Sequence, residues 1–340
     1  MAKKISRQTA VFDDLIYIKS YASIAGKEES EGPLGALFDE ISEDPYFGQE
    51  TWEQGESAFI RAAVKNVLRK ASLEPHDIDT ILAGDLLNQC VGSTFGIKEF
   101  NIPFIGIYGA CCTMSEGLML GSMLIDGGFG SNIIAATSSH FAAAERQFRF
   151  PMHYGGVRTP TAQWTCTASG AVILTEDKSD IGVKGFTTGK IVDFDVKDAS
   201  NMGAAMAPAA ADTIKTFLDD TGMKPSDFDA IVTGDLGTVG QKLLFELLEA
   251  ENIDIKNQHK DCGMMIFDRN KQDVHAGGSG CGCAASVLCA YFLPKLQSGE
   301  MKNILFCATG ALMSTTISQQ GGTIPGISHA VWLTDVRSQR

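Results

Sequence analysis

Two stretches, PHDIDTILAGDL (75–86) and PSDFDAIVTGDL (225–236), share a proline, an Asp-x-Asp pair and a closing Gly-Asp-Leu. Each follows a segment with apolar residues at helical spacing, 56–73 in the first copy and 207–222 in the second. Each then contains a short apolar run, DTILAGD or DAIVTGD, that predicts a strand. The recurrence of helix, turn and strand indicates that the chain contains two copies of one α/β unit.

A second pair of similar segments supports the duplication. Residues 107–138 resemble residues 279–310, and aligning the Ala-Thr pairs at 136–137 and 308–309 places Cys111 opposite Cys283. In both copies small residues precede a helix that is apolar almost all round, with Glu116 the only charge between 112 and 125 and none between 281 and 294. A helix without a polar face is expected to be covered on every side. Two such helices predict a helical layer between two sheets.

The remaining pattern completes the predicted architecture. Each half ends in an apolar strand, SGAVILTE (169–176) or SHAVWLTD (328–335). Alternating strands and helices are typical of α/β folds with largely parallel sheets. We therefore expect a five-layer α-β-α-β-α sandwich of two duplicated halves, residues 1–178 and 179–340. The first half contains an inserted loop, 138–168, whose counterpart in the second half is shorter.

Composition limits the possible functions. The formal net charge is −13, with 28 basic and 41 acidic residues, which argues against binding nucleic acid or lying flat on an anionic lipid surface. No apolar stretch reaches the ~18 residues of a spanning helix, and the first twenty residues lack a secretory signal. Nine cysteines, several inside apolar runs, are typical of free thiols in a reducing compartment. We expect a cytoplasmic protein without a bound cofactor.

The duplicated pattern, with Ala110-Cys111-Cys112-Thr113 before the first apolar helix, resembles the thiolase fold of thiolases and ketoacyl-carrier-protein synthases. In that fold a nucleophilic cysteine lies at the amino end of the buried helix of the first half. The resemblance implies that Cys111 occupies the nucleophile position. The partial positive charge at a helix N-terminus would favour its thiolate.

Long, specific segments carry a narrower resemblance. They include GPLGALFDE (32–40), ILAGDLLNQC (81–90), LIDGGFGSNIIAATSSH (124–140), AAAERQFRFP (142–151), MGAAMAPAAADTIK (202–215) and AGGSGCGC (276–283). These segments resemble the stage V sporulation protein AD family of endospore-forming bacteria. The resemblance implies a component of the spore-membrane transport complex that binds dipicolinic acid (pyridine-2,6-dicarboxylate) and moves it into the spore and out at germination. It also implies a location in the cytoplasm or the forespore, peripheral to the spore inner membrane, and contacts with the membrane subunits, and the relatives of the fold suggest a homodimer.

The residues that accompany the nucleophile in the condensing enzymes differ in this chain. Where their His follows a strand, this sequence has Gly234-Asp235-Leu236-Gly237, and Cys281 stands where their Asn would be. An anionic Asp235 would repel the negative charge that develops on a thioester carbonyl. We therefore expect a non-catalytic binding protein. Two alternatives stay open: an acyltransferase that uses Cys111 with an unconventional partner such as His259 or His275, and a scaffold for membrane subunits.

We expect the ligand to contact Cys111 and Cys281. Further candidate ligand residues come from two regions. Asp85, Asn88 and Asp235 follow equivalent strands, and ligands of α/β sheets bind at the carboxyl ends of strands. These aspartates could instead stabilise a turn or cap a helix, the interpretation that we favour for Asp235.

The inserted loop adds His140, Arg146 and Arg149. Arginine matches a carboxylate with a planar pair of donors, although these residues could instead form ion pairs at a subunit interface. Alternatively the ligand arrives as its calcium chelate, and aspartate oxygens bind the metal. The Cys281-x-Cys283 spacing fits close packing better than a zinc site, so we expect no bound metal.

Overall fold

The structure is a computed structural model that describes residues 2–148 and 157–337. Each half of the chain forms a five-stranded sheet, and the two sheets have the same strand order. The first contains, from its outer edge, β5 (Phe104–Gly106), β4 (Thr80–Gly84), β6 (Asn132–Ser139), β8 (Ala168–Thr175) and β2 (Thr9–Gly26). The second contains β11 (His259–Asp261), β10 (Ala230–Thr233), β13 (Asn303–Ala311), β14 (Gly326–Asp335) and β9 (Ile181–Thr187). This matching order confirms two copies of one unit.

The strand directions differ from the largely parallel sheets expected. In the first half β4 runs parallel to β5 and β6, whereas β8 runs antiparallel to β6 and β2. The second half repeats this arrangement, and β2 also pairs antiparallel with β9. The expectation was wrong because a buried apolar strand has the same pattern in either direction. The β2–β9 pairing joins the two sheets edge to edge.

Short strands and helices complete the sheets and the connections. They are β1 (Lys3–Lys4) and β3 (Glu40–Ser42) beside β2, the pair β7 (Trp164–Thr165) and β12 (Gly278–Ser279), α1 (Lys27–Ser30) and α8 (Cys262–Met265). The inserted loop contains α5 (Phe141–Phe148) and β7, whereas the corresponding connection between β13 and β14 contains α11 (Thr315–Gln319).

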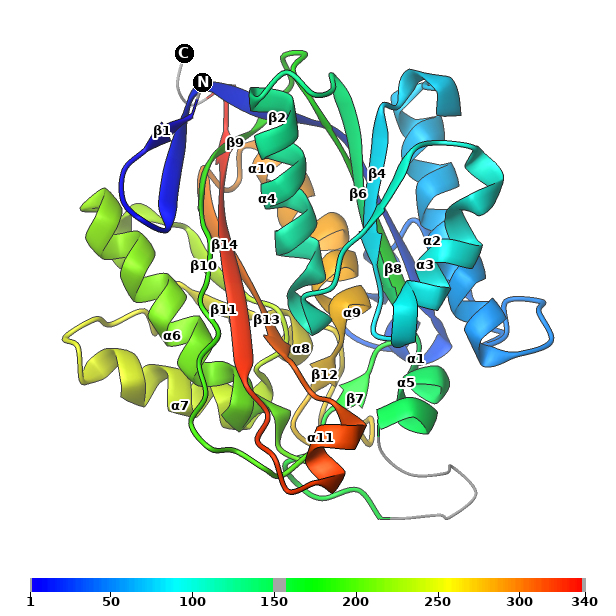
Figure 1. The fold of residues 1–340 in the computed structure, drawn as a ribbon, viewed down its shortest axis with the longest axis vertical. Helices are drawn as coiled ribbons and strands as arrows, with labels where there is room; N and C mark the ends of the chain where they lie inside the picture. Colours follow the sequence, from blue (N-terminus) through cyan, green and yellow to red (C-terminus); the bar gives the residue numbers. More distant parts are fainter. Residues whose placement is uncertain (1, 149–156, 338–340) are drawn as a thin grey trace.

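The helices form three layers around the sheets, as Figure 1 shows. The middle layer contains α4 (Thr113–Asp126) and the continuous run α9 (Cys281–Val287), η8 (Leu288–Phe292, a π-helix) and α10 (Leu293–Ser298). The outer layers contain α2 (Trp52–Ala71) with α3 (Val91–Ile97), and α6 (Met202–Thr221) with α7 (Gly237–Glu249). The fold is therefore the expected thiolase-like sandwich. Among the described residues, none of the helices combines the length and apolar character needed to cross a membrane.

The two central helices are not equally covered. Residues 281–290 are all buried, as expected for a helix without a polar face. In α4, by contrast, Leu120, Met123 and Leu124 remain partly exposed, and Figure 1 shows this helix at the front of the molecule with no other helix over it. The expectation that both helices are covered on every side is thus wrong for α4. We call its partly exposed side the open flank of α4.

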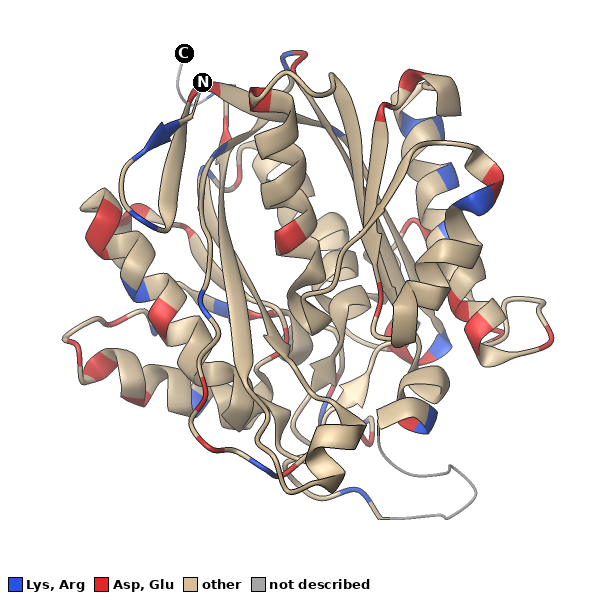
Figure 2. Ribbon diagram, viewed as in Figure 1, with Lys and Arg blue, Asp and Glu red and all other residues tan. Residues whose placement is uncertain are grey.

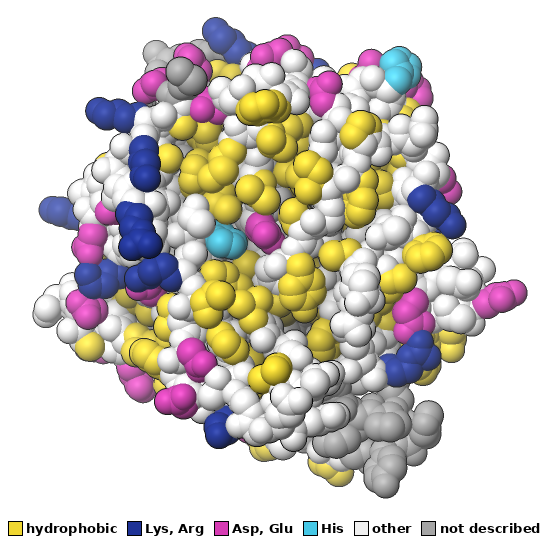
Figure 3. All heavy atoms as spheres, in the orientation of Figure 1, with side chains coloured by type: hydrophobic (Ala, Val, Ile, Leu, Met, Phe, Trp, Pro, Cys, Tyr) yellow, Lys and Arg dark blue, Asp and Glu magenta, His cyan; other side chains and the backbone are white. Residues whose placement is uncertain are grey.

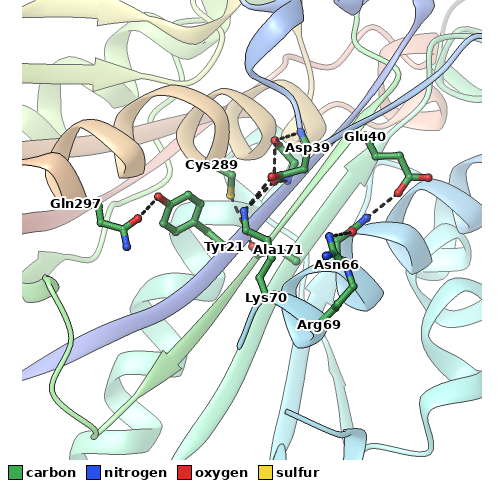
Figure 4. Close-up of polar contacts among 10 residues, drawn as sticks. Tyr21, Asp39, Glu40, Asn66, Arg69, Lys70, Ala171, Cys289 and Gln297 are labelled. Carbon is green, nitrogen blue, oxygen red and sulfur yellow. Dashed lines mark hydrogen bonds and ion pairs between the residues drawn. The ribbon is translucent and has the colours of Figure 1, made fainter. Parts of the chain in front are cut away.

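A group of polar contacts near the C-terminal end of α2 connects the first sheet with the helix layers on both of its faces (Figure 4). The ammonium group of Lys70 lies 3.0 Å from the Asp39 carboxylate and 4.9 Å from the centre of the Tyr21 ring. Asp39 accepts a hydrogen bond of 2.9 Å from the backbone N–H of Ser23 on β2. The Tyr21 hydroxyl donates to Gln297 of α10. The first sheet is therefore linked to both its outer and its central helix layer.

Candidate functional site

A strained turn places Cys111 at the start of α4. The residue before it, Ala110, has a φ of 51°, in the left-handed region that side chains other than glycine rarely adopt. The Thr113 hydroxyl donates to the carbonyl of Ala110 (2.6 Å) and accepts from the N–H of Gly109 (3.1 Å). On β13, Gly310 approaches so closely that a Cβ there would lie 2.2 Å from the carbonyl oxygen of Gly109. Such strain persists only where the surroundings enforce it, and it is common at functional sites.

The Cys111 thiol is held in its protonated form. Its side chain is 8% exposed, and Sγ lies 3.9 Å from the Ser279 hydroxyl. Burial raises the pKa of Cys111 well above its usual value, and the nearby Asp235 carboxylate raises this pKa further. The expected stabilisation of the thiolate by the helix N-terminus is therefore outweighed, because desolvation and a neighbouring negative charge both disfavour it.

Asp235 lies directly behind the thiol. Its carboxylate accepts hydrogen bonds from the Ser279 hydroxyl (3.0 Å), the Gly280 N–H (2.9 Å) and the Thr309 hydroxyl (2.9 Å), and it also interacts with Cys111. Burial raises the pKa of Asp235 to about 6. The interpretation of Asp235 as a turn or cap residue is wrong. Asp261 has that role, since it accepts from the N–H groups of Leu236 (2.8 Å) and Gly237 (3.1 Å).

Cys111 opens into a pocket of about 500 Å³, counting the solvent at its mouth. Most of the lining is apolar or aromatic, and its polar groups are three hydroxyls, the Cys111 thiol and one carboxylate. The lining residues are Leu86, Tyr108, Ala110, Cys111, Ala144, Glu145, Phe148, Thr165, Met202, Ser279, Ala311 and Met313. They come from both halves, so the pocket lies where the duplicated units meet.

Asp85 and Asn88 do not line this pocket. Asp85 is fully buried and accepts from the N–H of Leu87 (2.9 Å) and from both the N–H and the hydroxyl of Ser93 (2.7 Å each). Asn88 exchanges two hydrogen bonds of 3.1 Å with Gln147 of α5. The structure thus matches the turn interpretation of Asp85, and Asn88 anchors the inserted loop instead of facing the pocket.

The described cationic candidates of the loop also have partners elsewhere. His140 is buried, with Nε2 placed 2.8 Å from the carbonyl of Pro45, and burial lowers its pKa. The Arg146 guanidinium pairs with Glu53 and lies 5.3 Å from the centre of the Trp52 ring. Both side chains therefore tie the loop to the start of α2. Arg149 lies outside the described residues, and its contact with a ligand stays a prediction.

Cys281 lies in the wall behind the pocket. It is fully buried, packs in one cluster with Cys111, Leu86 and Ala144, and its thiol donates to the carbonyl of Ser138 (2.9 Å). Its predicted ligand contact, like those of Cys111 and Asp235, stays a prediction. In the described part of the chain, no group of three or more His, Cys, Asp or Glu side chains is arranged to hold a metal ion.

The described histidines that could have served Cys111 bond to other groups. His259 bonds to the Thr233 hydroxyl (2.9 Å) and to Gln241 (3.1 Å), and His275 pairs with Asp273 at 2.9 Å. His329 accepts from the N–H of Gly189 (3.0 Å). His153 is outside the described residues. The side chains that do adjoin the thiol, Ser279 and Asp235, are a hydroxyl and a carboxylate.

Two residues of the site were missed from the sequence. Ser279 and Thr309 surround Asp235 with hydroxyl donors, and the aligned segments already contained both of them. The Ala-Thr pair at 308–309 set the register between the two copies, but nothing in the pattern indicated that its hydroxyl points toward Asp235.

The family description Stage V sporulation protein AD (SpoVAD) matches residues 6–334. The chain belongs to this family. Stage V sporulation protein AD of Bacillus subtilis (strain 168) is 43% identical to it over 329 residues, which cover 97% of each chain. The assignment made from the shared segments is therefore confirmed.

Solved structures show the fold. Cerulenin-bound OleA of Xanthomonas campestris superposes with a TM-score of 0.59 and 14% identity, covering 98% of this chain and 100% of that one. The 3-oxoacyl-[acyl-carrier-protein] synthase III of Aquifex aeolicus VF5 gives 0.55 and 15%, covering 94% and 99%. At these identities the likeness establishes the thiolase-like fold alone.

Proposed function

We propose that this family member is a non-catalytic thiolase-fold protein that binds dipicolinic acid, free or as its calcium chelate, in the pocket above Cys111. In this way it supports transport of the ligand into spores during sporulation and its release at germination, at the periphery of the spore inner membrane. Family membership supports the sporulation role. One observation supports the absence of catalysis: Cys111 adjoins a buried carboxylate whose negative charge disfavours the thiolate that a nucleophile needs.

The surroundings of Cys111 disfavour acyl transfer at two steps. Attack on a thioester requires a thiolate, and both burial and Asp235 keep the thiol protonated. The intermediate carries an oxyanion, which needs hydrogen-bond donors and not a carboxylate beside it. The Ser279 hydroxyl and the Gly280 N–H already donate to Asp235.

The pocket has the chemical character needed for an aromatic diacid. Phe148, Met202 and Met313 offer apolar contacts to a flat ring, and the hydroxyls of Tyr108 and Thr165 can donate to its carboxylates. Glu145 also lines the pocket and would repel a free dianion. Neutralisation therefore comes from a calcium ion carried with the ligand or from Arg149.

Ligand binding is tested by thermal unfolding of the full chain with dipicolinate, with and without calcium. A ligand that binds only the native state stabilises it by about 2.7 kcal/mol when present at about a hundredfold excess over Kd, which raises Tm. Pyridine-3,5-dicarboxylate, which has the same charge but cannot chelate through its ring nitrogen, is the control. An unchanged Tm at millimolar dipicolinate in both arms would contradict binding and favour a scaffold for membrane subunits.

The acyltransferase alternative is tested by mass spectrometry after incubation with acetyl- and malonyl-coenzyme A. We expect no adduct on the peptide that contains Cys111, because the thiol is protonated. An adduct that forms and turns over, and that is lost in Cys111→Ser, would establish an enzyme.

The proposal includes a homodimer formed through the face shown in Figure 3, where hydrophobic side chains gather over the middle and most charged ones lie around the edge. The open flank of α4 exposes Leu120, Met123 and Leu124. The edge strand β5 pairs with β4 on one side only, and its Ile105 is 46% exposed. An apolar face and an open strand edge are typical of contacts between copies of a chain. Sedimentation equilibrium should show a dimer. The substitution Leu124→Asp on α4 should disrupt this dimer, whereas the control Leu37→Asp, at an exposed leucine that is not on α4 or β5, should not.

A further inference from the structure

Glu116 is the one charged residue in the middle of the open flank of α4. Its side chain is half-buried, and its Oε2 is buried without a hydrogen-bond partner in the described part of the chain. The carboxyl group packs over the backbone before Cys111, where a Cβ on Gly109 would lie 2.9 Å from Oε2. Figure 2 shows the centre of the molecule almost free of charged residues apart from α4. An ionisable group therefore lies in the face through which two copies are proposed to meet.

Among the described residues, no charged neighbour stabilises ionised Glu116. Burial alone raises its pKa to about 7. The thiols of Cys90 and Cys112 have pKa values raised by burial, and burial lowers that of His329 on β14 to about 4, so all three are neutral near pH 7. The other charged groups on the strands packed against α4 are engaged elsewhere or exposed. Asp335 of β14 pairs with Arg337, and Lys19 of β2 pairs with Asp177. Asp13 and Asp14 of β2 are exposed to solvent.

We propose that Glu116 acts as a proton switch for self-association, so that two copies close over α4 only when this carboxyl group is protonated. This inference rests on the proposed homodimer. Closing the face would remove the remaining water from a carboxylate that already has one oxygen without a partner. Burying an unpaired charge is costly, whereas a protonated carboxyl group is neutral and can donate its hydrogen to a nearby oxygen.

The symmetry of a dimer strengthens the effect. In a two-fold contact the same patch comes from both copies, so two Glu116 side chains enter one interface. Two ionised carboxylates would repel each other as well as lose water. Association should therefore take up one proton per copy, and it should weaken as the pH rises through about 7.

The test is sedimentation velocity of the full chain from pH 5.5 to 8.5 at constant ionic strength. Above about pH 7 the dimer Kd should rise with pH. The expected rise is about tenfold per pH unit if the dimer takes up one proton and about a hundredfold per pH unit if it takes up two. Glu116→Gln should associate at every pH as tightly as the wild type does at pH 5.5. Asp126→Asn, which removes the other acid of α4, should keep the wild-type pH dependence.

A second measurement does not depend on a variant that folds. Calorimetric dilution of the wild-type dimer in buffers of different ionisation enthalpy should reveal release of about one proton per copy near pH 7.5. A dimer whose Kd does not change with pH and whose dissociation releases no proton would overturn the switch and leave the homodimer intact. A chain that stays monomeric at all pH values, with Glu116→Gln monomeric too, would overturn both.

Discussion

At the scale of single residues, Asp235 decides the character of the site. Its buried carboxylate accepts hydrogen bonds from Ser279, Gly280 and Thr309. The same carboxylate places a negative charge beside the Cys111 thiol. In an enzyme of this kind a neutral imidazole or amide beside the thiol would be expected to accept its proton or to stabilise an oxyanion. The negative charge of Asp235 instead raises the pKa of the thiol.

Asp235→Asn should make Cys111 more reactive. The amide keeps an acceptor for the surrounding donors but removes the charge that raises the pKa of the thiol, so alkylation by iodoacetamide at pH 8 should be several-fold faster. The rate is followed by mass spectrometry of the peptide containing Cys111. Cys90 is an internal control, because its pKa is raised by burial and Asp85 and not by Asp235. Equal rates for Cys111 in both proteins would show that burial alone protects it.

Glu29 should make stability depend on pH. Glu29 is buried, and its Oε1 accepts from the Thr167 N–H (2.9 Å), whereas Oε2 has no hydrogen-bond partner among residues 2–148 and 157–337. Burial raises the pKa of Glu29 from 4.5 to about 8. The folded state binds the proton of Glu29 more tightly than the unfolded state does. The protonated Glu29 side chain therefore makes its full contribution to the free energy of unfolding below about pH 4.5, and this contribution is lost as the pH rises through about 8. Urea unfolding of Glu29→Gln should show a smaller decline between pH 5 and 8 than the wild type, by on the order of a few kcal/mol. Glu28→Gln is the near control: Glu28 raises the pKa of Glu29 by charge repulsion but less than burial does, so this variant should reduce the decline much less. A Glu29→Gln variant with the same decline as the wild type would show that Glu29 is ionised in the folded protein.

At the scale of elements, the end of β13 and the turn before α4 fit together with no space left. Gly310→Ala would place a Cβ 2.2 Å from the carbonyl oxygen of Gly109, a backbone atom that cannot move without moving Cys111. We expect a loss of about 2–3 kcal/mol in the free energy of unfolding, together with a changed alkylation rate of Cys111. Gly106→Ala is the matched control, since its Cβ would have only ordinary contacts of 3.5 and 3.7 Å with the Phe104 ring. Equal stability of the two variants would show that the turn is not held by this contact.

Much of this arrangement could be predicted from the sequence, because duplication repeats residues as well as elements. The Gly-Asp-Leu turns and the aligned cysteines placed the strand ends and central helices of both halves. Strand direction could not be predicted, since a buried strand has the same apolar pattern whether it runs parallel or antiparallel to its neighbours. The partners of His140 and Arg146, Pro45 and Glu53, are distant in sequence, and no local pattern indicated those contacts. The open flank of α4 was also hidden, because an apolar helix looks the same whether its cover comes from its own chain or from another copy.

At the scale of the whole molecule, net charge and the apolar front face act in opposite directions. Each chain has a formal charge of −13, so two copies repel each other over distances comparable with the Debye length, about 10 Å at 0.1 M salt. The proposed contact has few charges of its own, as Figure 3 shows, and must form against this long-range repulsion. Self-association is therefore expected to depend on conditions that screen or remove negative charge.

Salt should strengthen the dimer. At pH 6, where Glu116 is mainly protonated, raising NaCl from about 20 to 300 mM shortens the range of the repulsion and leaves apolar contacts intact, so Kd should fall about two- to tenfold. Sedimentation equilibrium at each salt concentration measures this. A control is the double variant Glu249→Gln with Asp254→Asn, at and just beyond the end of α7. It removes two negative charges outside the proposed contact. Its Kd should be lower than that of the wild type at about 20 mM salt and nearly the same at about 300 mM. If Kd instead rose with salt, ion pairs would be holding the copies together, and the contact would have to lie on a charged face of the molecule and not over α4.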